Sequence, residues 1–166
     1  MSTSDNLQDA FAGESQANRK YLAFAKKAQE DGYPQVAKLF LAAAEAETVH
    51  AHAHFRVLGG VKDTSENLEA AIEGEGFEFQ HMYPNFLSEA AAEGDKPATL
   101  TFKNALAVEE IHHGLYTQAL EAVKSGSDLP EKKIHVCLVC GNTVYGEPPD
   151  KCPVCGAPVQ QFKEVM

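Results

Sequence analysis

Residues 105–116 read ALAVEEIHHGLY, a helical pattern that places Glu109 and His112 three positions apart. Residues with this spacing lie on the same face of an α-helix, so one glutamate and one histidine can reach the same metal site. Residues 44–55 read AEAETVHAHAHF and repeat the spacing with Glu47 and His50. The two Glu-x-x-His pairs predict a helical body organised around a metal centre.

Lone glutamates precede both pairs on helix faces that are otherwise apolar. The interval from Glu14 to Glu47 is 33 residues, and the interval from Glu75 to Glu109 is 34 residues. Glutamate is rarely buried without a partner, so an inward position indicates a ligand. One Glu from each of two helices plus Glu-x-x-His from each of two others is the ligand plan of carboxylate-bridged di-metal bundles. The predicted ligands are Glu14, Glu47, His50, Glu75, Glu109 and His112.

Glu110 and His113 form a competing pair on the last helix. Their face also carries Lys103, Thr117 and Lys124, which is typical of a solvent face, so Glu109 and His112 are preferred. A single Glu-x-x-His is a weak signal, whereas two pairs at matched spacing are difficult to obtain by chance. Among the other histidines, His54 shares the face of the first pair and is a candidate partner of its ligands. Ordinary surface or packing roles are expected for His52, His81, His113 and His135.

The balance between the ligand carboxylates and the iron charges indicates a role for Glu78 as an additional ligand. The four ligand carboxylates balance two ferrous ions, and oxidation to two ferric ions adds two positive charges. Glu78 lies one helical turn after Glu75 and is a spare carboxylate within reach. We therefore expect Glu78 to bind when the iron is oxidised and to release when it is reduced. The alternative is an outward carboxylate that only borders the site.

The helical part divides into four stretches with short loops between them. Short loops make sequential helices antiparallel neighbours, which predicts an all-α up-down four-helix bundle. Pro84 lies inside the third stretch, where we expect a kink or local irregularity. The expected stretches run from Ser4 to Glu30, from Pro34 to Gly59-Gly60, from Thr64 to about Glu93, and from Lys96-Pro97 to Gly126.

The C-terminal segment contains two Cys-x-x-Cys pairs with a linker before them. Four thiolates at this spacing impose tetrahedral coordination, which suits a single iron or zinc. The alternative interpretation is a structural zinc ribbon. Because a di-iron site needs an electron supply, iron is favoured in the four-cysteine site. The expected domains are 1–128 for the bundle and 134–166 for the metal domain. The expected ligands are Cys137, Cys140, Cys152 and Cys155.

The bulk composition sets the class of protein. The chain has 166 residues, 44% hydrophobic and 23% charged, and a formal net charge of −10. Such an acidic chain is a poor candidate for binding nucleic acid or anionic membranes. Its first residues lack a basic start followed by an apolar run, so no signal peptide is expected. A cytoplasmic location follows as an expectation, and reduced cysteines there read as metal ligands before disulfides.

With these motifs in place, the chain resembles the rubrerythrin family, a ferritin-like di-iron domain followed by a rubredoxin-like domain. The resemblance extends from Glu14 to Phe162, and the stretches GEGFE at 74–78 and MYP at 82–84 resemble the family's third helix. It implies that Glu78 is the extra carboxylate and that iron moves between His50 and Glu78 with redox state. It also implies that Tyr21 and Tyr83 lie near the centre, where their hydroxyls would hydrogen-bond ligating carboxylates.

The same resemblance implies a peroxidase that reduces hydrogen peroxide to water. Electrons would arrive from NAD(P)H through a separate reductase or a rubredoxin, and the protein would be a homodimer. Zinc is the alternative occupant of the four-cysteine site in recombinant material. Two rival functions stay open: a ferroxidase or iron-handling ferritin-like protein, and a non-enzymatic binding module with a zinc tail.

Overall fold

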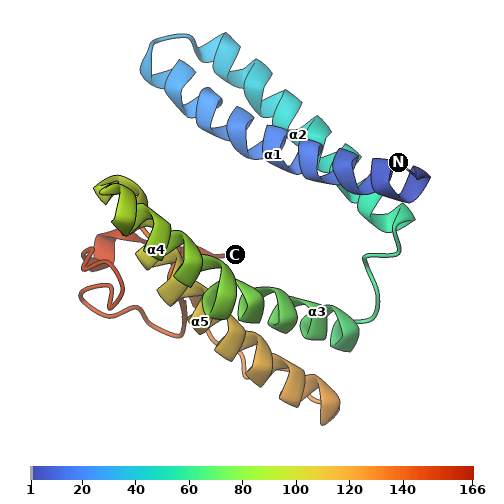
Figure 1. Cartoon of the computed structure of the whole chain (residues 1–166), viewed down its shortest axis with the longest axis vertical. Helices are drawn as coiled ribbons and strands as arrows, with labels where there is room; N and C mark the ends of the chain where they lie inside the picture. The colour runs from blue at the N-terminus through green and yellow to red at the C-terminus, as the bar shows by residue number, and fades with distance from the viewer. Residues whose placement is uncertain (1) are drawn as a thin grey trace. The chain divides into compact units, whose positions relative to one another are not determined.

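The computed structural model describes residues 2–166, whose contacts define two compact units. One unit ends at Lys62, and the other runs from Asp63 to Met166. Figure 1 shows a helical hairpin in the first unit, and helices with a small C-terminal domain in the second.

The first unit is an antiparallel pair of helices, α1 (Thr3–Glu30) and α2 (Pro34–Val57). Ser2 caps α1, because its hydroxyl accepts a hydrogen bond from the backbone N–H of Asp5 while the Asp5 carboxylate accepts one from the Ser2 backbone. This reciprocal arrangement satisfies two N–H groups that the first helical turn leaves unpaired. Proline opens α2, where a missing N–H costs no helical hydrogen bond.

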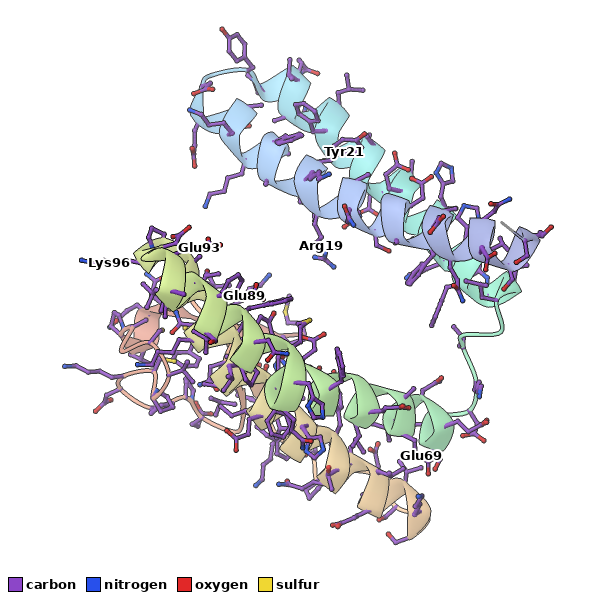
Figure 2. All side chains as sticks on the ribbon, viewed as in Figure 1. Arg19, Tyr21, Glu69, Glu89, Glu93 and Lys96 are labelled. Atoms are coloured by element: carbon purple, nitrogen blue, oxygen red, sulfur yellow. The ribbon has the colours of Figure 1, made fainter. Side chains whose placement is uncertain are left out.

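Aromatic rings and small residues pack the hairpin. Phe11 stacks on Phe55 with ring centroids 4.8 Å apart. Tyr21 on α1 lies 6.1 Å from the ring of Phe40 on α2, by centroids (Figure 2). Small side chains allow the two helix backbones to approach each other. The fully buried positions of the pair are all alanine: Ala25, Ala28, Ala37, Ala44 and Ala51.

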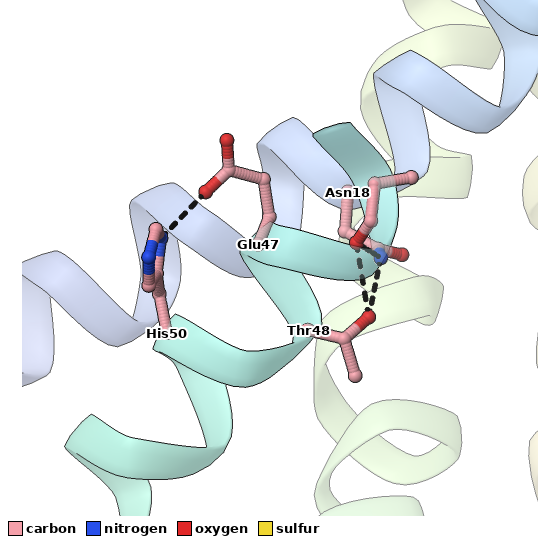
Figure 3. A network of polar contacts seen from close by, with 5 residues as sticks. Asn18, Glu47, Thr48 and His50 are labelled. Carbon is pink, nitrogen blue, oxygen red and sulfur yellow. Dashed lines mark hydrogen bonds and ion pairs between the residues drawn. The ribbon is translucent and has the colours of Figure 1, made fainter. Parts of the chain in front are cut away.

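A polar contact fixes the register of the hairpin. The Asn18 side-chain amide donates to the Ala44 carbonyl oxygen at 2.7 Å and to Thr48 Oγ1 at 2.8 Å, as Figure 3 shows for Asn18 and Thr48. These atoms are part-buried, so their hydrogen bonds compete less with water than exposed ones do. Thr48 follows Glu47 directly, so this contact also fixes the turn that carries one predicted ligand.

The helices of the second unit contain one irregular turn. A π-helical turn separates two α-helices, and the backbone N–H of Tyr83 donates to the carbonyl of Glu78, five residues earlier. Pro84 has no N–H and its ring crowds the preceding turn, so a widened turn there is physically expected. The irregularity expected near Pro84 is this turn. The elements are α3 (Thr64–Phe77), η1 (Glu78–Met82), α4 (Tyr83–Glu93) and α5 (Lys96–Lys124).

Helices α3 and α4 run antiparallel to α5, as two contacts at opposite ends of these helices show. At one end, Lys124 Nζ lies 2.7 Å from Glu69 Oε1 (Glu69 is labelled in Figure 2). At the other end, the rings of Phe86 and Phe102 have centroids 5.5 Å apart. The predicted ligands Glu75, Glu109 and His112 lie between these two contacts.

The C-terminal domain is a three-stranded antiparallel sheet with the strand order β2-β1-β3. Its strands are β1 (Ile134–Cys137), β2 (Thr143–Tyr145) and β3 (Phe162–Val165). The buried side chains of this domain are His135, Cys137, Asn142 and Cys152, all of them polar or metal-ligating types. An apolar core is therefore nearly absent, and such a small domain depends on a bound metal for its stability.

This domain packs on α5 within the second unit. Gly141, with φ +87°, lies against the buried Val108, whose Cγ1 would be 3.8 Å from a Cβ at position 141. A cavity of about 220 Å³ is lined by residues of α3, of α5 and of this domain. Its lining is mostly apolar and includes Leu68, Leu115, Tyr116, Ile134, Thr143 and Tyr145.

The predicted fold class is confirmed: a helical body in four stretches, followed by a small domain with four clustered cysteines. Each helix starts and ends within a few residues of its expected position. The domain boundaries 1–128 and 134–166 stay a prediction. Within residues 2–166, no helix is both long and apolar enough to cross a membrane.

We predict that Asn18→Ala lowers the free energy of unfolding by about 1–2 kcal/mol, because two part-buried hydrogen bonds between α1 and α2 are lost. Urea unfolding followed by circular dichroism measures the change. Gln16→Ala is the matched control, since Gln16 is an exposed side chain on the same helix. Equal unfolding midpoints for the two variants would contradict the prediction.

Candidate metal centres

The first unit carries a carboxylate–histidine triad made by Glu14 of α1 with Glu47 and His50 of α2. One potential ligand atom from each residue lies within 4.8 Å of the others. Glu47 Oε2 is 3.0 Å from His50 Nδ1, as Figure 3 shows. The side chain of Glu47 is mostly buried, whereas that of His50 is 55% exposed. The three-residue spacing along α2 thus places both groups on the side that faces Glu14.

The two carboxylates of this triad shift each other's pKa in opposite directions. A hydrogen bond to Glu47 raises the pKa of Glu14, and the same bond lowers the pKa of Glu47, with His50 lowering it further. Glu14 is therefore the more readily protonated carboxylate of the pair. Together with His50, the two carboxylates could hold a divalent cation.

The second unit carries a matching triad made by Glu75 of α3 with Glu109 and His112 of α5. Ligand atoms from the three residues again lie within 4.8 Å of one another. His112 Nδ1 is 2.8 Å from Glu109 Oε2 and 3.7 Å from Glu75 Oε1. Nδ1 is therefore the ring nitrogen that faces the carboxylates.

The electrostatics of the second triad favour a cation. Burial, followed by the negative charge of Glu109, raises the pKa of Glu75 to about 7. Two carboxylates held this closely cannot both stay ionised without a compensating charge. Metal binding supplies that charge, and carboxylate and imidazole ligands suit iron.

Glu78 and Tyr83 lie next to the second triad without belonging to it. Burial and the charge of Glu109 raise the pKa of Glu78, while His112 acts in the opposite direction. Burial also raises the pKa of Tyr83, with further contributions from Glu78, Glu109 and Glu75. Glu78 and Tyr83 flank the π-helical turn, which places both side chains within electrostatic reach of the same carboxylates.

Tyr21 has a different environment. Its ring contacts Phe24 and Phe40 within the aromatic packing of the hairpin. The expected hydrogen bond from its hydroxyl to a ligating carboxylate stays a prediction.

The remaining histidines have other contacts. The ring of His113 packs edge-on against Phe79, and Glu110, the other member of the competing pair, is exposed. His135 is buried, and its Nδ1 lies 2.8 Å from the Gly146 carbonyl oxygen. The pKa of Glu14 is raised overall, and the charge of His54 is the last of the contributions that oppose this rise. The role of His54 as a partner of the ligands stays a prediction.

The four cysteines form a compact cluster in the C-terminal domain. Their sulfurs lie within 4.8 Å of one another, with 3.7 Å between those of Cys137 and Cys155 and 3.6 Å between those of Cys140 and Cys152. All four are free thiols. Four soft sulfur donors at these separations fit one tetrahedral iron or zinc ion.

The thiols of the cluster are unequal. Burial raises the pKa of Cys140. Burial acts in the same direction on Cys152, but backbone N–H groups of Cys155 and Val154, together with side-chain hydrogen bonds from Cys140 and Cys155, lower the pKa to about 7. N–H donors aimed at sulfur stabilise a thiolate and tune a metal bound to it.

Two residues next to this cluster escaped the sequence analysis. Asn142 is 2% exposed and its amide Nδ2 lies 3.7 Å from Cys152 Sγ. The Thr143 hydroxyl lies 2.9 Å from His112 Nε2. Their position directly after Cys140-Gly141 was the available signal, because the residues after such a turn lie beside the metal. The contact with a helix residue 31 positions earlier has no local signature.

Two family models match this chain. Residues 5–120 match the family model Rubrerythrin, and residues 135–163 match the model for the rubrerythrin, rubredoxin-like domain. Together the two models cover both carboxylate–histidine triads and all four cysteines.

Individual proteins are similar over nearly the whole chain. Rubrerythrin-2 of Clostridium acetobutylicum is 35% identical over 97% of this chain and 95% of its own length. Nigerythrin of Nitratidesulfovibrio vulgaris is 35% identical over 97% of this chain and 85% of its own. A solved structure of nigerythrin in the fully reduced, all-ferrous state matches with a TM-score of 0.59 at 34% identity, covering 99% of this chain and 87% of that one.

We predict that removing metal from the four-cysteine site unfolds the C-terminal sheet while the α1–α2 hairpin keeps its structure. The sheet lacks an apolar core, whereas the hairpin packs alanine and aromatic side chains. Amide hydrogen exchange before and after chelation measures this. Protection should be lost at β1 and β3 and retained along α1. Retained protection in the sheet after complete chelation would contradict the prediction.

We predict that metal-free protein loses stability as pH rises from 5 to 8, and that Glu75→Gln reduces this loss. The raised pKa of about 7 means that folded Glu75 keeps a proton that the unfolded chain releases near its ordinary value. Its contribution is thus fully present below the unfolded pKa and disappears as pH passes through the folded one. Urea unfolding of both forms across this range is the measurement, and identical pH profiles would refute the assignment.

Proposed function

Because this chain belongs to the rubrerythrin family of di-iron oxidoreductases, we propose that it reduces hydrogen peroxide to water with electrons delivered through its C-terminal iron site. The family brings a di-iron centre and a rubredoxin-like iron site to the chain. The observation that carries the proposal is the presence of two carboxylate–histidine triads and a four-cysteine cluster in one chain.

The proposed iron ligands are the residues of these clusters. Two triads offer four carboxylates and two imidazoles, which is the donor set of a di-iron centre in a helical bundle. Glu78 is the proposed extra carboxylate, exchanging with His50 as the iron changes its redox state. The proposed set is Glu14, Glu47, His50, Glu75, Glu109 and His112 for two irons, and Cys137, Cys140, Cys152 and Cys155 for one.

Peroxide reduction consumes two electrons and two protons and yields two water molecules. When bound, two ferrous ions supply both electrons at once. Side chains beside the second triad can handle the protons. In the metal-free protein, burial raises the pKa of both Glu78 and Tyr83, and the Tyr83 hydroxyl is a hydrogen-bond donor. Tyr83 can orient a ligating carboxylate or a peroxide oxygen with that hydroxyl.

The four-cysteine iron and an external donor are proposed to supply the electrons. A single iron held by four thiolates carries one electron, so it must act twice for each peroxide molecule. The proposed donors are an NAD(P)H-linked reductase or a rubredoxin, and hydrogen peroxide is the proposed substrate. A cytoplasmic location, where free cysteines stay reduced, and a homodimeric assembly complete the proposal.

The test is a comparison of oxidants on iron-loaded protein that has been fully reduced without oxygen. Absorption spectra are recorded after one equivalent of peroxide and, separately, after dissolved oxygen. We expect fast oxidation by peroxide, slow oxidation by oxygen, and a visible ferric–thiolate band. Equal rates with both oxidants and a colourless four-cysteine site would favour the rival function, a zinc-tailed ferroxidase.

We predict that Glu78→Gln lowers the rate of peroxide-driven iron oxidation by about 10-fold to 100-fold, because a carboxylate beside the irons is lost. Stopped-flow absorption at fixed peroxide concentration measures the rate. Glu89→Gln is the matched control, since Glu89 is an exposed carboxylate of α4 (labelled in Figure 2). A wild-type rate for Glu78→Gln would remove Glu78 from the reaction.

A further inference from the structure

The two ring nitrogens of His112 face different parts of the second unit. Nδ1 lies among the carboxylates, 2.8 Å from Glu109 Oε2. Nε2 points away from them and lies 2.9 Å from Thr143 Oγ1. A neutral imidazole that gives one nitrogen to a metal carries its proton on the other. With the metal on Nδ1, the Nε2–H therefore donates to the Thr143 hydroxyl.

Thr143 extends this contact toward the cysteine cluster. Its hydroxyl donates to the Gly141 carbonyl oxygen at 3.3 Å, which leaves its lone pairs free to accept from His112. Gly141 is covalently joined to Cys140, a proposed iron ligand. The route from Cys140 to His112 thus runs through the peptide bond to Gly141, the Gly141 α-carbon and carbonyl group, one hydroxyl and two hydrogen bonds.

Asn142 holds this turn in place from the other side. Its side-chain amide donates a hydrogen bond to the Cys152 sulfur, and its backbone N–H donates one to the sulfur of Cys140. Its carbonyl accepts from the backbone N–H of Cys137 at 2.9 Å. The turn at residues 140–143 is therefore held against the cysteine sulfurs by Asn142. The contact of Gly141 with Val108 holds the same turn against α5.

The surroundings leave few substitutes for the hydroxyl. Thr143 borders the cavity of about 220 Å³, whose wall is mostly apolar. A water molecule needs several polar partners to be held in such a place. Loss of the hydroxyl should therefore leave the Nε2–H of His112 poorly satisfied.

We propose that Thr143 is a positioning residue that joins the two metal sites: its hydroxyl completes a hydrogen-bonded electron route from Cys140 through Gly141 to His112. The inference rests on the proposed function. Each transfer oxidises the ferrous iron of the four-cysteine site to ferric and reduces one ferric ion of the di-iron centre to ferrous. Two transfers restore the centre after one peroxide, and the external donor supplies both electrons.

The experiment compares Thr143→Val, which keeps the shape and removes the hydroxyl, with Thr143→Ser, which keeps the hydroxyl. Full-length, iron-loaded protein is reduced at both sites and mixed with limiting peroxide, and the ferric–thiolate band is followed. We expect Thr143→Val to slow the appearance of that band about 10-fold or more while the initial oxidation of the di-iron centre is unchanged. Thr143→Ser should stay close to the wild-type rate.

A second measurement reports the hydrogen bond itself. In the reduced iron-loaded protein, the exchangeable Nε2 proton of His112 gives a shifted proton NMR signal. Thr143→Val should speed its exchange with solvent, and Thr143→Ser should not. A wild-type transfer rate in Thr143→Val would overturn the proposal, and so would an equally slow Thr143→Ser.

If the protein is not a peroxidase, the experiment gives a different result. In that case peroxide would not oxidise the ferrous di-iron centre of the wild-type protein. The route would then be tested in the reverse preparation, with ferric protein reduced by a one-electron photochemical donor that acts at the four-cysteine site. Slower filling of the di-iron centre in Thr143→Val supports the route without any peroxide, and equal filling overturns it.

Discussion

Repulsion between carboxylates held at short distance is the constraint on which the helical part depends. Burial and the nearby charge of Glu109 raise the pKa of Glu75 to about 7, and a hydrogen bond to Glu47 raises the pKa of Glu14. Each pair needs either a proton or a cation to remain compact.

The helices serve this requirement through a small number of local features. Glu-x-x-His spacing places a carboxylate and an imidazole on one face of α2 and on one face of α5. Asn18 fixes the register of α1 against α2 beside the first triad. The π-helical turn between α3 and α4 places Glu78 and Tyr83 at the second triad, as π turns often do at functional sites.

A second constraint acts in the C-terminal domain. Its buried positions belong to cysteines, one histidine and one asparagine, so a metal takes the place of an apolar core. The same turn that presents Cys140 also carries Thr143 to α5, where it contacts His112. Structural support for one metal site and a connection to the other therefore come from a single short segment.

The sequence by itself determined the helices, the irregularity near Pro84, the four-cysteine domain and the two Glu-x-x-His pairs, because each depends on spacing within one segment. Only the tertiary structure decided which side chains outside the Glu-x-x-His and Cys-x-x-Cys motifs lie beside the metal-binding triads. Tyr21 lies among aromatic rings, whereas the Thr143 hydroxyl lies at His112. Packing between distant segments sets such contacts and the burial that shifts a pKa, and neither leaves a periodic signal in the chain.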